Sequence, residues 1–229
     1  MTDSSLAFVF PGQGSQRTGM LQEAHARFEC VRETFQQASD ALGFDLWALV
    51  TGDHQEALNL TETTQPVLLT CGVALWRAWQ AIDGPPPALM AGHSLGEFSA
   101  LTCAGSFAFD DAVRLVRLRG EAMQTAVPVG EGAMAAVLGL KDADIERICA
   151  EVTAAGSGIV EAVNYNAPGQ VVIAGERAAL DRAVAALKEA GARRAVPLPV
   201  SAPFHTTLMT PAGERLRAAL AELTVKTPA

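Results

Sequence analysis

The serine in residues 88–101, ALMAGHSLGEFSAL, constrains the fold of this chain more than any other feature. Ser94 lies between two glycines, after a short apolar run and before a stretch with helical periodicity. The pentapeptide GHSLG matches the G-x-S-x-G pattern, which in α/β enzymes marks a sharp turn from a strand into a helix. The pattern predicts that Ser94 is a nucleophile, and the alternative is a serine that only caps the following helix.

The composition excludes several classes of protein. The chain has 229 residues, of which 49% are hydrophobic and 18% charged, as is typical of a globular protein. Its formal net charge of -8 argues against a nucleic-acid-binding protein, because such proteins oppose phosphates with basic surface. The first residues, MTDSSLAFVFPGQG, have the features of neither a signal peptide nor a membrane span. We therefore expect a cytoplasmic protein with no nucleic-acid partner and no membrane partner.

The cysteines indicate neither a disulfide framework nor a metal site. They are widely scattered, and none has a second cysteine or a histidine at the spacing of metal ligands. Free cysteines pack as small hydrophobic residues. We therefore expect free, mostly buried thiols and no metal at Cys30, Cys71, Cys103 and Cys149.

The hydrophobic pattern predicts an α/β chain with a large α/β-hydrolase-like lobe and an inserted small lobe. Residues 1–126 form the first part of the large lobe. They are expected to contain a strand at 6–10, an amphipathic helix from about 20 to 42, a buried helix at 64–82, a strand leading into the serine motif and a helix at 110–127. Pro66 is expected in the first turn of the buried helix, where proline is tolerated.

A change of pattern after the segment PVGEG marks the small lobe, residues 127–200. Its elements are expected in the order β-α-β-β-α-β, which is the split βαβ, or ferredoxin-like, arrangement. Residues 201–229 then return to the large lobe as a loop and a helix.

A serine nucleophile needs a base, and the chain offers four histidines. His25 and His54 lie in polar surroundings and are interpreted as solvated surface residues. His93 adjoins Ser94, and because adjacent side chains on a strand point to opposite faces it is interpreted as a support for the turn. That leaves His205 as the candidate base, with a buried, hydrogen-bonded structural histidine as the alternative.

The loop FPGQGSQ near the N-terminus lacks the third glycine of a dinucleotide-binding fingerprint, since Arg17 stands at that position. Its backbone N–H groups could instead stabilise an oxyanion. An N–H from this loop, such as that of Gln13, and the N–H of Leu95 would together form the two-donor oxyanion hole that acyl transfer requires.

Arginine 119 shares a helical stripe with apolar residues, which predicts that it is half buried. A buried guanidinium keeps its proton and therefore needs an anionic partner. The partner of Arg119 is either an internal carboxylate or the carboxylate of a substrate. Arg114 and Arg117 are expected on a solvated side of the same helix, with Asp110 and Glu121 as their i,i+4 partners. The apolar stripe consists of Ala112, Leu115, Val116 and Met123.

Six motifs, in order along the whole chain, resemble the malonyl-CoA:acyl carrier protein transacylase family: FVFPGQGSQ, TQP, GHSLGE, RLRG, NYNAPGQVVIAG and PVSAPFH. The resemblance implies that Ser94 accepts the malonyl group as an ester and that His205 is its general base and acid. It implies that Gln13 and Leu95 supply the oxyanion N–H groups and that Arg119 pairs with the malonyl carboxylate. Further positions match residues that line the acyl pocket, namely Gln65, Met123, Asn166 and Phe204.

The resemblance also implies a double displacement in fatty acid biosynthesis, with malonyl-CoA and acyl carrier protein as partners and no cofactor. Both partners carry phosphopantetheine, and Arg193 and Arg194 in the segment ARRA form a candidate phosphate patch, with a solvated strand end as the alternative. Family members usually continue past the position where this sequence stops. The backbone carbonyl that orients their histidine lies in that further segment.

Two other functions remain open at this point. A serine esterase or thioesterase would share the serine turn, and would usually carry an acid between the serine and the histidine. The candidates Asp142, Asp144 and Asp181 all fall in the expected small lobe, which is the wrong place. The other possibility is a non-catalytic module that binds the carrier protein.

Overall fold

The computed structural model describes residues 3–53, 55–200 and 202–228, so His54 lies outside the described residues. The chain forms two compact units, one of Met1–Glu121 with Leu216–Ala229 and one of Ala122–Arg215. Helices and strands mix in both, which confirms the expected α/β class. The boundaries of these units lie after residues 121 and 215, whereas the expected segments were 1–126, 127–200 and 201–229.

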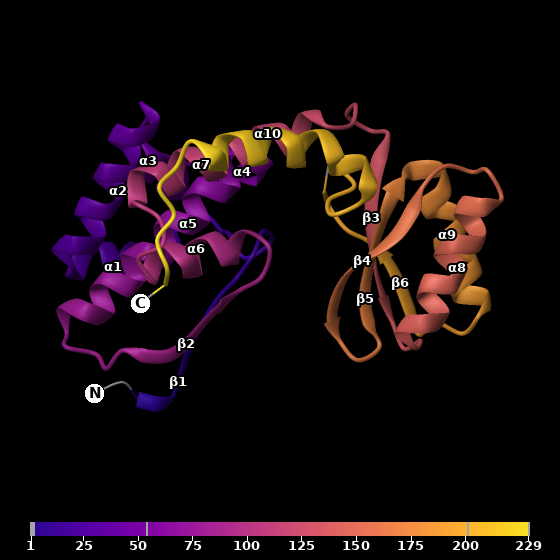
Figure 1. Cartoon of the computed structure of the whole chain (residues 1–229), viewed down its shortest axis with the longest axis horizontal. Helices are drawn as coiled ribbons and strands as arrows, with labels where there is room; N and C mark the ends of the chain where they lie inside the picture. Colours follow the sequence, from indigo (N-terminus) through magenta and orange to yellow (C-terminus); the bar gives the residue numbers. More distant parts are fainter. Residues whose placement is uncertain (1–2, 54, 201, 229) are drawn as a thin grey trace. The chain divides into compact units, whose positions relative to one another are not determined.

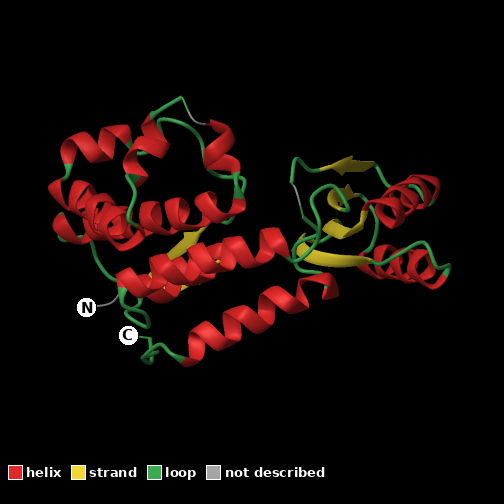
Figure 2. Ribbon diagram, turned by 90° about the horizontal axis from the view of Figure 1, so that it is seen from above, coloured by secondary structure: helices red, strands yellow, loops and turns green. Residues whose placement is uncertain are grey.

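The first unit is mainly helical around a small parallel sheet (Figures 1 and 2). Its two strands pair with Phe10 opposite Gly92, so both strands end at the same edge. In chain order its elements are β1 (Asp3–Phe10), α1 (Gln22–Arg27), α2 (Glu29–Leu42), α3 (Leu46–Thr51), α4 (Gln55–Asn59), α5 (Thr61–Ala81), β2 (Pro87–Gly92), α6 (Leu95–Cys103) and α7 (Phe109–Thr125). Helix α10 (Thr210–Ala221) begins in the second unit and ends in the first.

The core of the first unit is built around α5, which is the longest of these helices and is buried along most of its length. Large apolar side chains from α2, α3 and α4 are fully buried in this core. Burying a side chain of this size contributes about 1.5–3 kcal/mol. Examples are Phe35, Leu46 and Leu58, which pack in the same core as Leu69 of α5.

The prediction of one helix from about 20 to 42 is wrong, because Phe28 interrupts it. Phe28 has an extended backbone, with φ -113° and ψ 124°, between α1 and α2. Helix α2 places Val31, Phe35 and Ala38 in the core, whereas α1 buries none of its residues. The break at Phe28 thus allows α2 to take the orientation that buries its apolar face, independently of α1.

Two short helices, α3 and α4, were not expected from the sequence. The buried helix α5 also begins three residues earlier than expected, at Thr61. Pro66 therefore lies in the second turn, and the prediction that it lies in the first turn is wrong. An interior proline removes one helical hydrogen bond, so the carbonyl of Glu62 loses its usual partner four residues along the chain.

The second unit contains the expected β-α-β-β-α-β order: β3 (Gly132–Leu138), α8 (Asp142–Ala154), β4 (Val160–Ala167), β5 (Gln170–Glu176), α9 (Arg177–Glu189) and β6 (Arg194–Pro197). The strands lie in the order β4-β5-β3-β6 and every neighbouring pair is antiparallel. This is the topology of the split βαβ arrangement, so the ferredoxin-like prediction is confirmed. Strand β6 is short, with four residues.

Alternation along the strands gives this sheet two buried faces. Ala135 and Ile173 pack with α8 and α9, which lie side by side on one face in Figure 1. Met134 and Val172 point the other way, into a cluster that includes Phe204 from the loop before the short 3-10 helix η1 (Thr207–Met209). The sheet therefore supports the loop that carries His205. Within the part of the chain that is described, no helix is long and apolar enough to cross a membrane.

Candidate functional site

Ser94 occupies the turn between β2 and α6, as the G-x-S-x-G pattern predicts. Its backbone has φ 54° and ψ -104°, a conformation that is unfavourable for any residue with a side chain. Strain of this kind costs about 1–3 kcal/mol and is found mostly at functional sites. The hydroxyl makes no capping hydrogen bond to α6, so the helix-cap alternative does not describe it.

The two glycines of the motif are required by close backbone contacts. A methyl group on Gly92 would overlap the backbone of Gly96, and a methyl group on Gly96 would overlap the carbonyl of Phe10. The sharp turn therefore brings the ends of β1 and β2 and the start of α6 closer together than any side chain allows. These contacts fix the position of Ser94 at the edge of the sheet where both strands end.

The loop after β1 is held in place by several hydrogen bonds. Gln13 donates from Nε2 to Oγ1 of Thr61, the first residue of α5, over 3.2 Å. The N–H of Gly14 donates to Oε1 of Gln16 over 2.8 Å, and the N–H of Gly19 donates to the carbonyl of Val50 over 2.7 Å. This anchoring suits a loop whose backbone N–H groups must keep a fixed direction.

Leu95 is the first residue of α6 and is 1% exposed. An N–H in the first turn of a helix has no partner within that helix, and the positive end of the helix dipole lies beside it. Both features favour a developing negative charge next to Ser94. The assignment of the Gln13 and Leu95 N–H groups as oxyanion donors stays a prediction.

Arg119 connects two of the expected site residues. Its Nη1 donates to Oε1 of Gln65 over 2.7 Å, and its Nη2 donates to Oγ of Ser94 over 3.1 Å. Gln65 is 1% exposed and Arg119 is 9% exposed, so the burial expected for Arg119 is confirmed. Three of the sequence-predicted site residues therefore lie within one hydrogen-bonded chain in the first unit.

The charge of Arg119 is not balanced by an ion pair. Among the described residues, no carboxylate lies within salt-bridge distance of its guanidinium, although the charge of Glu97 acts on it from farther away. Burial lowers the pKa of Arg119 to about 10, an effect that Glu97 partly opposes, so the side chain is cationic at neutral pH. The guanidinium also lies over the ring of Phe98, 5.4 Å from its centroid. A buried cation without a carboxylate is suited to bind an anionic ligand.

The other two arginines of α7 differ from the expectation. Arg114 pairs with Asp111 over 3.5 Å and not with Asp110, whose carboxylate accepts from Gln37. Arg117 does pair with Glu121, over 2.7 Å, but its side chain is only 27% exposed and also contacts α5. The prediction that Arg117 faces solvent is therefore wrong.

His205 lies in the second unit, on a loop fixed to the sheet. It has a positive φ of 66°, and its side chain is exposed, so it is not the buried structural histidine of the alternative interpretation. Thr206 donates from Oγ1 to the carbonyl of Pro203 over 2.7 Å. The N–H of Thr207 donates to Oε2 of Glu161 on β4 over 2.7 Å. The loop thus has a defined conformation on both sides of the histidine.

The other expected site residues of the second unit differ in their exposure to solvent. Met123 and Phe204 are each 7% exposed and belong to the same buried cluster. Asn166 is exposed near the end of β4. Arg193 and Arg194 are exposed at the start of β6, as a phosphate patch or a solvated strand end would both require. The ligand-binding roles of these residues stay predictions.

His25 is not the solvated surface residue that the sequence suggests. Its ring stacks on Trp47 with 3.8 Å between centroids and an interplanar angle of 4°. Burial, assisted by the charge of Arg32, lowers its pKa. His25 is therefore part of the packing of α1 against α3.

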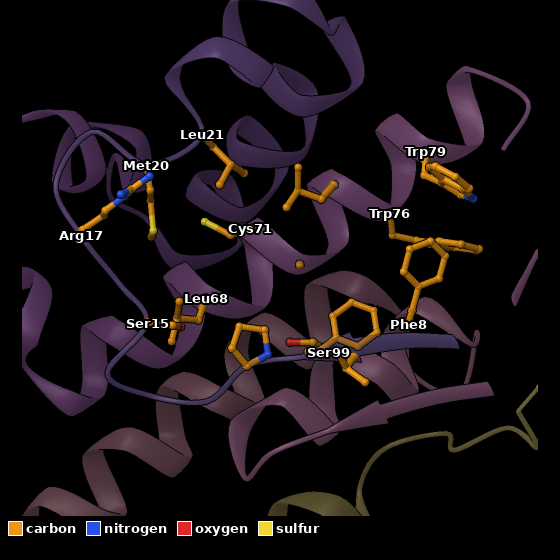
Figure 3. Close-up of a pocket in the computed structure, with 15 residues that line it drawn as sticks. Phe8, Ser15, Arg17, Met20, Leu21, Leu68, Cys71, Trp76, Trp79 and Ser99 are labelled. Carbon is orange, nitrogen blue, oxygen red and sulfur yellow. The ribbon is translucent and has the colours of Figure 1, made fainter. Parts of the chain in front are cut away.

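A separate apolar cavity of about 640 Å³ lies in the first unit (Figure 3). Aromatic side chains form one part of its wall, where Phe8 meets Trp76 and Trp79 edge to face at 5.4 and 5.6 Å between centroids. Ser99 on α6 lines it, but Ser94 does not. The cavity is thus distinct from the chain of site residues around Arg119.

Cys71, Cys103 and Cys149 are poor competitors of Ser94 as nucleophiles. All four cysteines are free, as expected, although only Cys71 and Cys149 are fully buried. Burial raises the pKa of Cys71 and of Cys103 to about 12 and that of Cys149 to about 11. Since the thiolate is the reactive form, these thiols are inert near neutral pH.

Slow alkylation by iodoacetamide at pH 8 is the expected result for Cys71, Cys103 and Cys149. With a pKa near 12, the thiolate of Cys71 is about a thousandfold scarcer than that of an ordinary thiol. Unfolding in urea should restore ordinary reactivity, and peptide mapping measures both rates. The raised pKa of Cys71 also links its protonation to folding. The stability that the protonated thiol contributes to the folded state is fully present below pH 9 and is lost as the pH rises toward 12. Rapid labelling of Cys71 in the folded protein would contradict the structure.

The comparisons with known proteins agree with these motifs. Residues 7–229 match the family model of the acyl transferase domain. A malonyl CoA-acyl carrier protein transacylase of Salmonella typhimurium is 57% identical over 98% of this chain and 72% of its own length. The crystal structure of a malonyl-CoA:acyl carrier protein transacylase from Xanthomonas oryzae matches with a TM-score of 0.96 and 55% identity, over 100% of this chain and 72% of that one.

A further match is a solved complex of a type II PKS acyl-carrier protein with its malonyl-transacylase. It has a TM-score of 0.94 and 55% identity, and covers 97% of this chain and 71% of that chain. Both the family model and the identity over nearly the full chain place the sequence in one family. The chain belongs to the acyl transferase domain family, in the group of the malonyl CoA-acyl carrier protein transacylases.

Proposed function

We propose that this chain is an acyltransferase that moves a malonyl group from coenzyme A to the phosphopantetheine thiol of an acyl carrier protein. The observation that carries the proposal is the contact between Arg119 and Ser94, with 3.1 Å between Nη2 and Oγ. It places beside the candidate nucleophile a buried cation that has no carboxylate partner among the described residues. A malonyl thioester has a carboxylate two bonds from the carbonyl that is attacked, so one ligand can engage both groups.

In the first half-reaction, Ser94 Oγ attacks the thioester carbonyl of malonyl-CoA. The new C–O bond forms as the hydroxyl proton passes to His205, and the carbonyl oxygen becomes an oxyanion. Backbone N–H groups of Gln13 and Leu95 stabilise that charge. The C–S bond then breaks, and the departing sulfur takes the proton from His205. The products are a malonyl-serine ester and free coenzyme A.

The second half-reaction is the reverse process with a different thiol. The pantetheine thiol of the carrier protein gives its proton to His205 as its sulfur attacks the ester carbonyl. A second oxyanion forms in the same position, the C–O bond to Ser94 breaks, and His205 returns the proton to Oγ. Each bond and proton is accounted for without a metal or cofactor, so two successive displacements suit a single serine.

Arg119 has a defined part in this scheme. Its planar guanidinium donates in a fork that matches a carboxylate, and Gln65 holds one nitrogen of that fork in place. The malonyl carboxylate supplies the negative charge that the buried site lacks. Met123, Asn166 and Phe204 are proposed to line the acyl pocket.

The exposed Arg193 and Arg194 are proposed to meet phosphate groups of coenzyme A or of the carrier protein. Four free thiols are typical of a reducing compartment, and on that ground we propose a cytoplasmic location. In the proposed reaction, malonyl-CoA and the carrier protein react with Ser94 one after the other.

The direct test is intact-protein mass spectrometry after mixing with malonyl-CoA. We expect a mass increase of one malonyl group, located on Ser94 by peptide mapping, and its loss when a holo acyl carrier protein is added. An esterase would release malonate to water at the same rate with or without the carrier. A non-catalytic carrier-binding module would bind the carrier and never gain the malonyl mass, and either outcome would overturn the proposal.

A further inference from the structure

The RLRG segment of α7 contacts the first two turns of α5 in three ways. Arg119 donates to the side chain of Gln65 over 2.7 Å. Gly120 lies against the backbone, where a methyl group would come within 2.5 Å of Cα of Glu62. Arg117 donates from Nη1 to the carbonyl oxygen of Glu62 over 3.1 Å. Helix α7 is therefore fixed to the backbone of α5 one turn before Gln65.

The carbonyl that Arg117 binds has lost its ordinary partner. In a regular helix the carbonyl of Glu62 would accept from the N–H of residue 66, but that residue is Pro66, which has no N–H. The guanidinium of Arg117 supplies a donor in its place. Pro66 and Arg117 thus form a matched pair, in which one removes a helical hydrogen bond and the other replaces it from a different helix.

We propose that Arg117 is a positioning residue for malonyl recognition, acting through the Glu62 carbonyl and Gln65 on Arg119. This inference rests on the proposed function of Arg119. Arg117 holds the first turns of α5 against α7, so that the carboxamide of Gln65 stays 2.7 Å from Nη1 of Arg119. Without that contact the fork of Arg119 loses its fixed direction, and only a donor with a carboxylate is affected.

The ion pairs of Arg117 account for its proposed positioning role less well than its hydrogen bond to the Glu62 carbonyl does. Its side chain reaches Glu121 over 2.7 Å and Glu62 over 3.4 Å, but these carboxylates are 41% and 32% exposed. Ion pairs of this exposure contribute little to stability. The hydrogen bond to the Glu62 carbonyl differs, because it reaches the backbone of α5 and is charge-assisted. We therefore assign the positioning of α5, and with it of Gln65, to the contact between Arg117 and the Glu62 carbonyl.

The experiment compares Arg117→Met with the matched control Arg114→Met, measuring kcat/KM for malonyl-CoA and for acetyl-CoA. Arg114 lies on the same helix and its ion pair is exposed. For Arg117→Met we expect the malonyl-to-acetyl ratio to fall by about 10-fold to 100-fold, with acetyl-CoA turnover nearly unchanged. Arg114→Met should keep the wild-type ratio. Equal losses for both donors, or an unchanged ratio, would overturn the inference.

Two further variants separate the carbonyl contact from the ion pairs. Pro66→Ala restores an N–H that can bind the Glu62 carbonyl, so Pro66→Ala combined with Arg117→Met should recover most of the lost ratio. Glu121→Gln removes the stronger ion pair and leaves the carbonyl contact, so it should keep the wild-type ratio. No recovery in the double variant, or a loss in Glu121→Gln as large as in Arg117→Met, would show that Arg117 acts through its charge.

A failure of the positioning role of Arg117 can be distinguished from a failure of the proposed acyltransferase function. If the wild-type chain gains no malonyl group, the proposed function fails, and the inference is then tested by the crystal structure of Arg117→Met. A contact between Gln65 Oε1 and Arg119 Nη1 that persists at hydrogen-bond distance in that variant would overturn the positioning role. If the wild type is acylated and the Arg117→Met ratio stays unchanged, the inference alone fails.

Discussion

Ser94→Ala should abolish formation of the malonyl-enzyme and reduce transfer to the carrier protein by at least about 10⁴-fold. No other described side chain is a comparable nucleophile beside Arg119, and the cysteine thiols with raised pKa values are mostly protonated at neutral pH. The fold should persist, because alanine fits the same turn and leaves the glycine contacts of the motif in place. Intact-protein mass spectrometry and a thermal melt measure both effects.

Ser99→Ala is the matched control. Ser99 lies on α6, five residues after Ser94, and is 2% exposed, but it lines the separate apolar cavity. The Ser99→Ala protein should still gain the malonyl group. A Ser94→Ala protein that is labelled as fully as the wild type would remove Ser94 from the mechanism.

Arg119→Ala should invert the preference for donors. The substitution leaves the malonyl carboxylate buried without a partner, which should cost about 2–5 kcal/mol, or about 30-fold to a few thousand-fold in kcat/KM. Acetyl-CoA has no carboxylate, so its kcat/KM should be maintained or increase as the site loses an unpaired cation. Kinetics with both donors measure the ratio directly.

Arg119→Lys should recover only part of the malonyl activity, because an ammonium keeps the charge without the planar fork. If Arg119 only stabilises the fold, the result is different: the melting temperature falls and both donors lose activity equally. Arg114→Ala, on the same helix, controls for the loss of a positive charge from α7. An unchanged donor ratio in Arg119→Ala would exclude that residue from substrate recognition.

Local patterns in the sequence predicted the features that depend on neighbouring residues. The GHSLG pentapeptide predicted the turn at Ser94, because the glycines and the flanking apolar runs together allow only a strand, a sharp turn and a helix. The strands and helices of the second unit were predicted from the change of hydrophobic pattern after PVGEG. The stripe of α7 also predicted the burial of Arg119, which is 9% exposed.

Features that depend on distant residues were not accessible in the same way. Nothing in the local sequence of Phe28 indicates a break, since the periodicity continues across it and the break serves the packing of α2 in the core. Arg117 has a suitable i,i+4 partner, so its sequence favours a surface ion pair. Its contact with α5 follows only once that helix is known to begin at Thr61, which leaves the Glu62 carbonyl unsatisfied by Pro66.

The start of α5 has a consequence for redesigning acyl selectivity. Thr61 holds the side chain of Gln13 and, one turn later, Gln65 holds Arg119. One short helical segment therefore supports both the loop proposed to supply an oxyanion N–H group and the arginine proposed to bind the malonyl carboxylate. A mutant library that varies this segment would alter catalysis and selectivity together, and most of its members would be inactive. Variation at Met123 and Phe204, which lie in a separate cluster, leaves that support intact. Because these two residues are also proposed to line the acyl pocket, we expect new donor specificities to be more accessible to directed evolution from their positions than from α5.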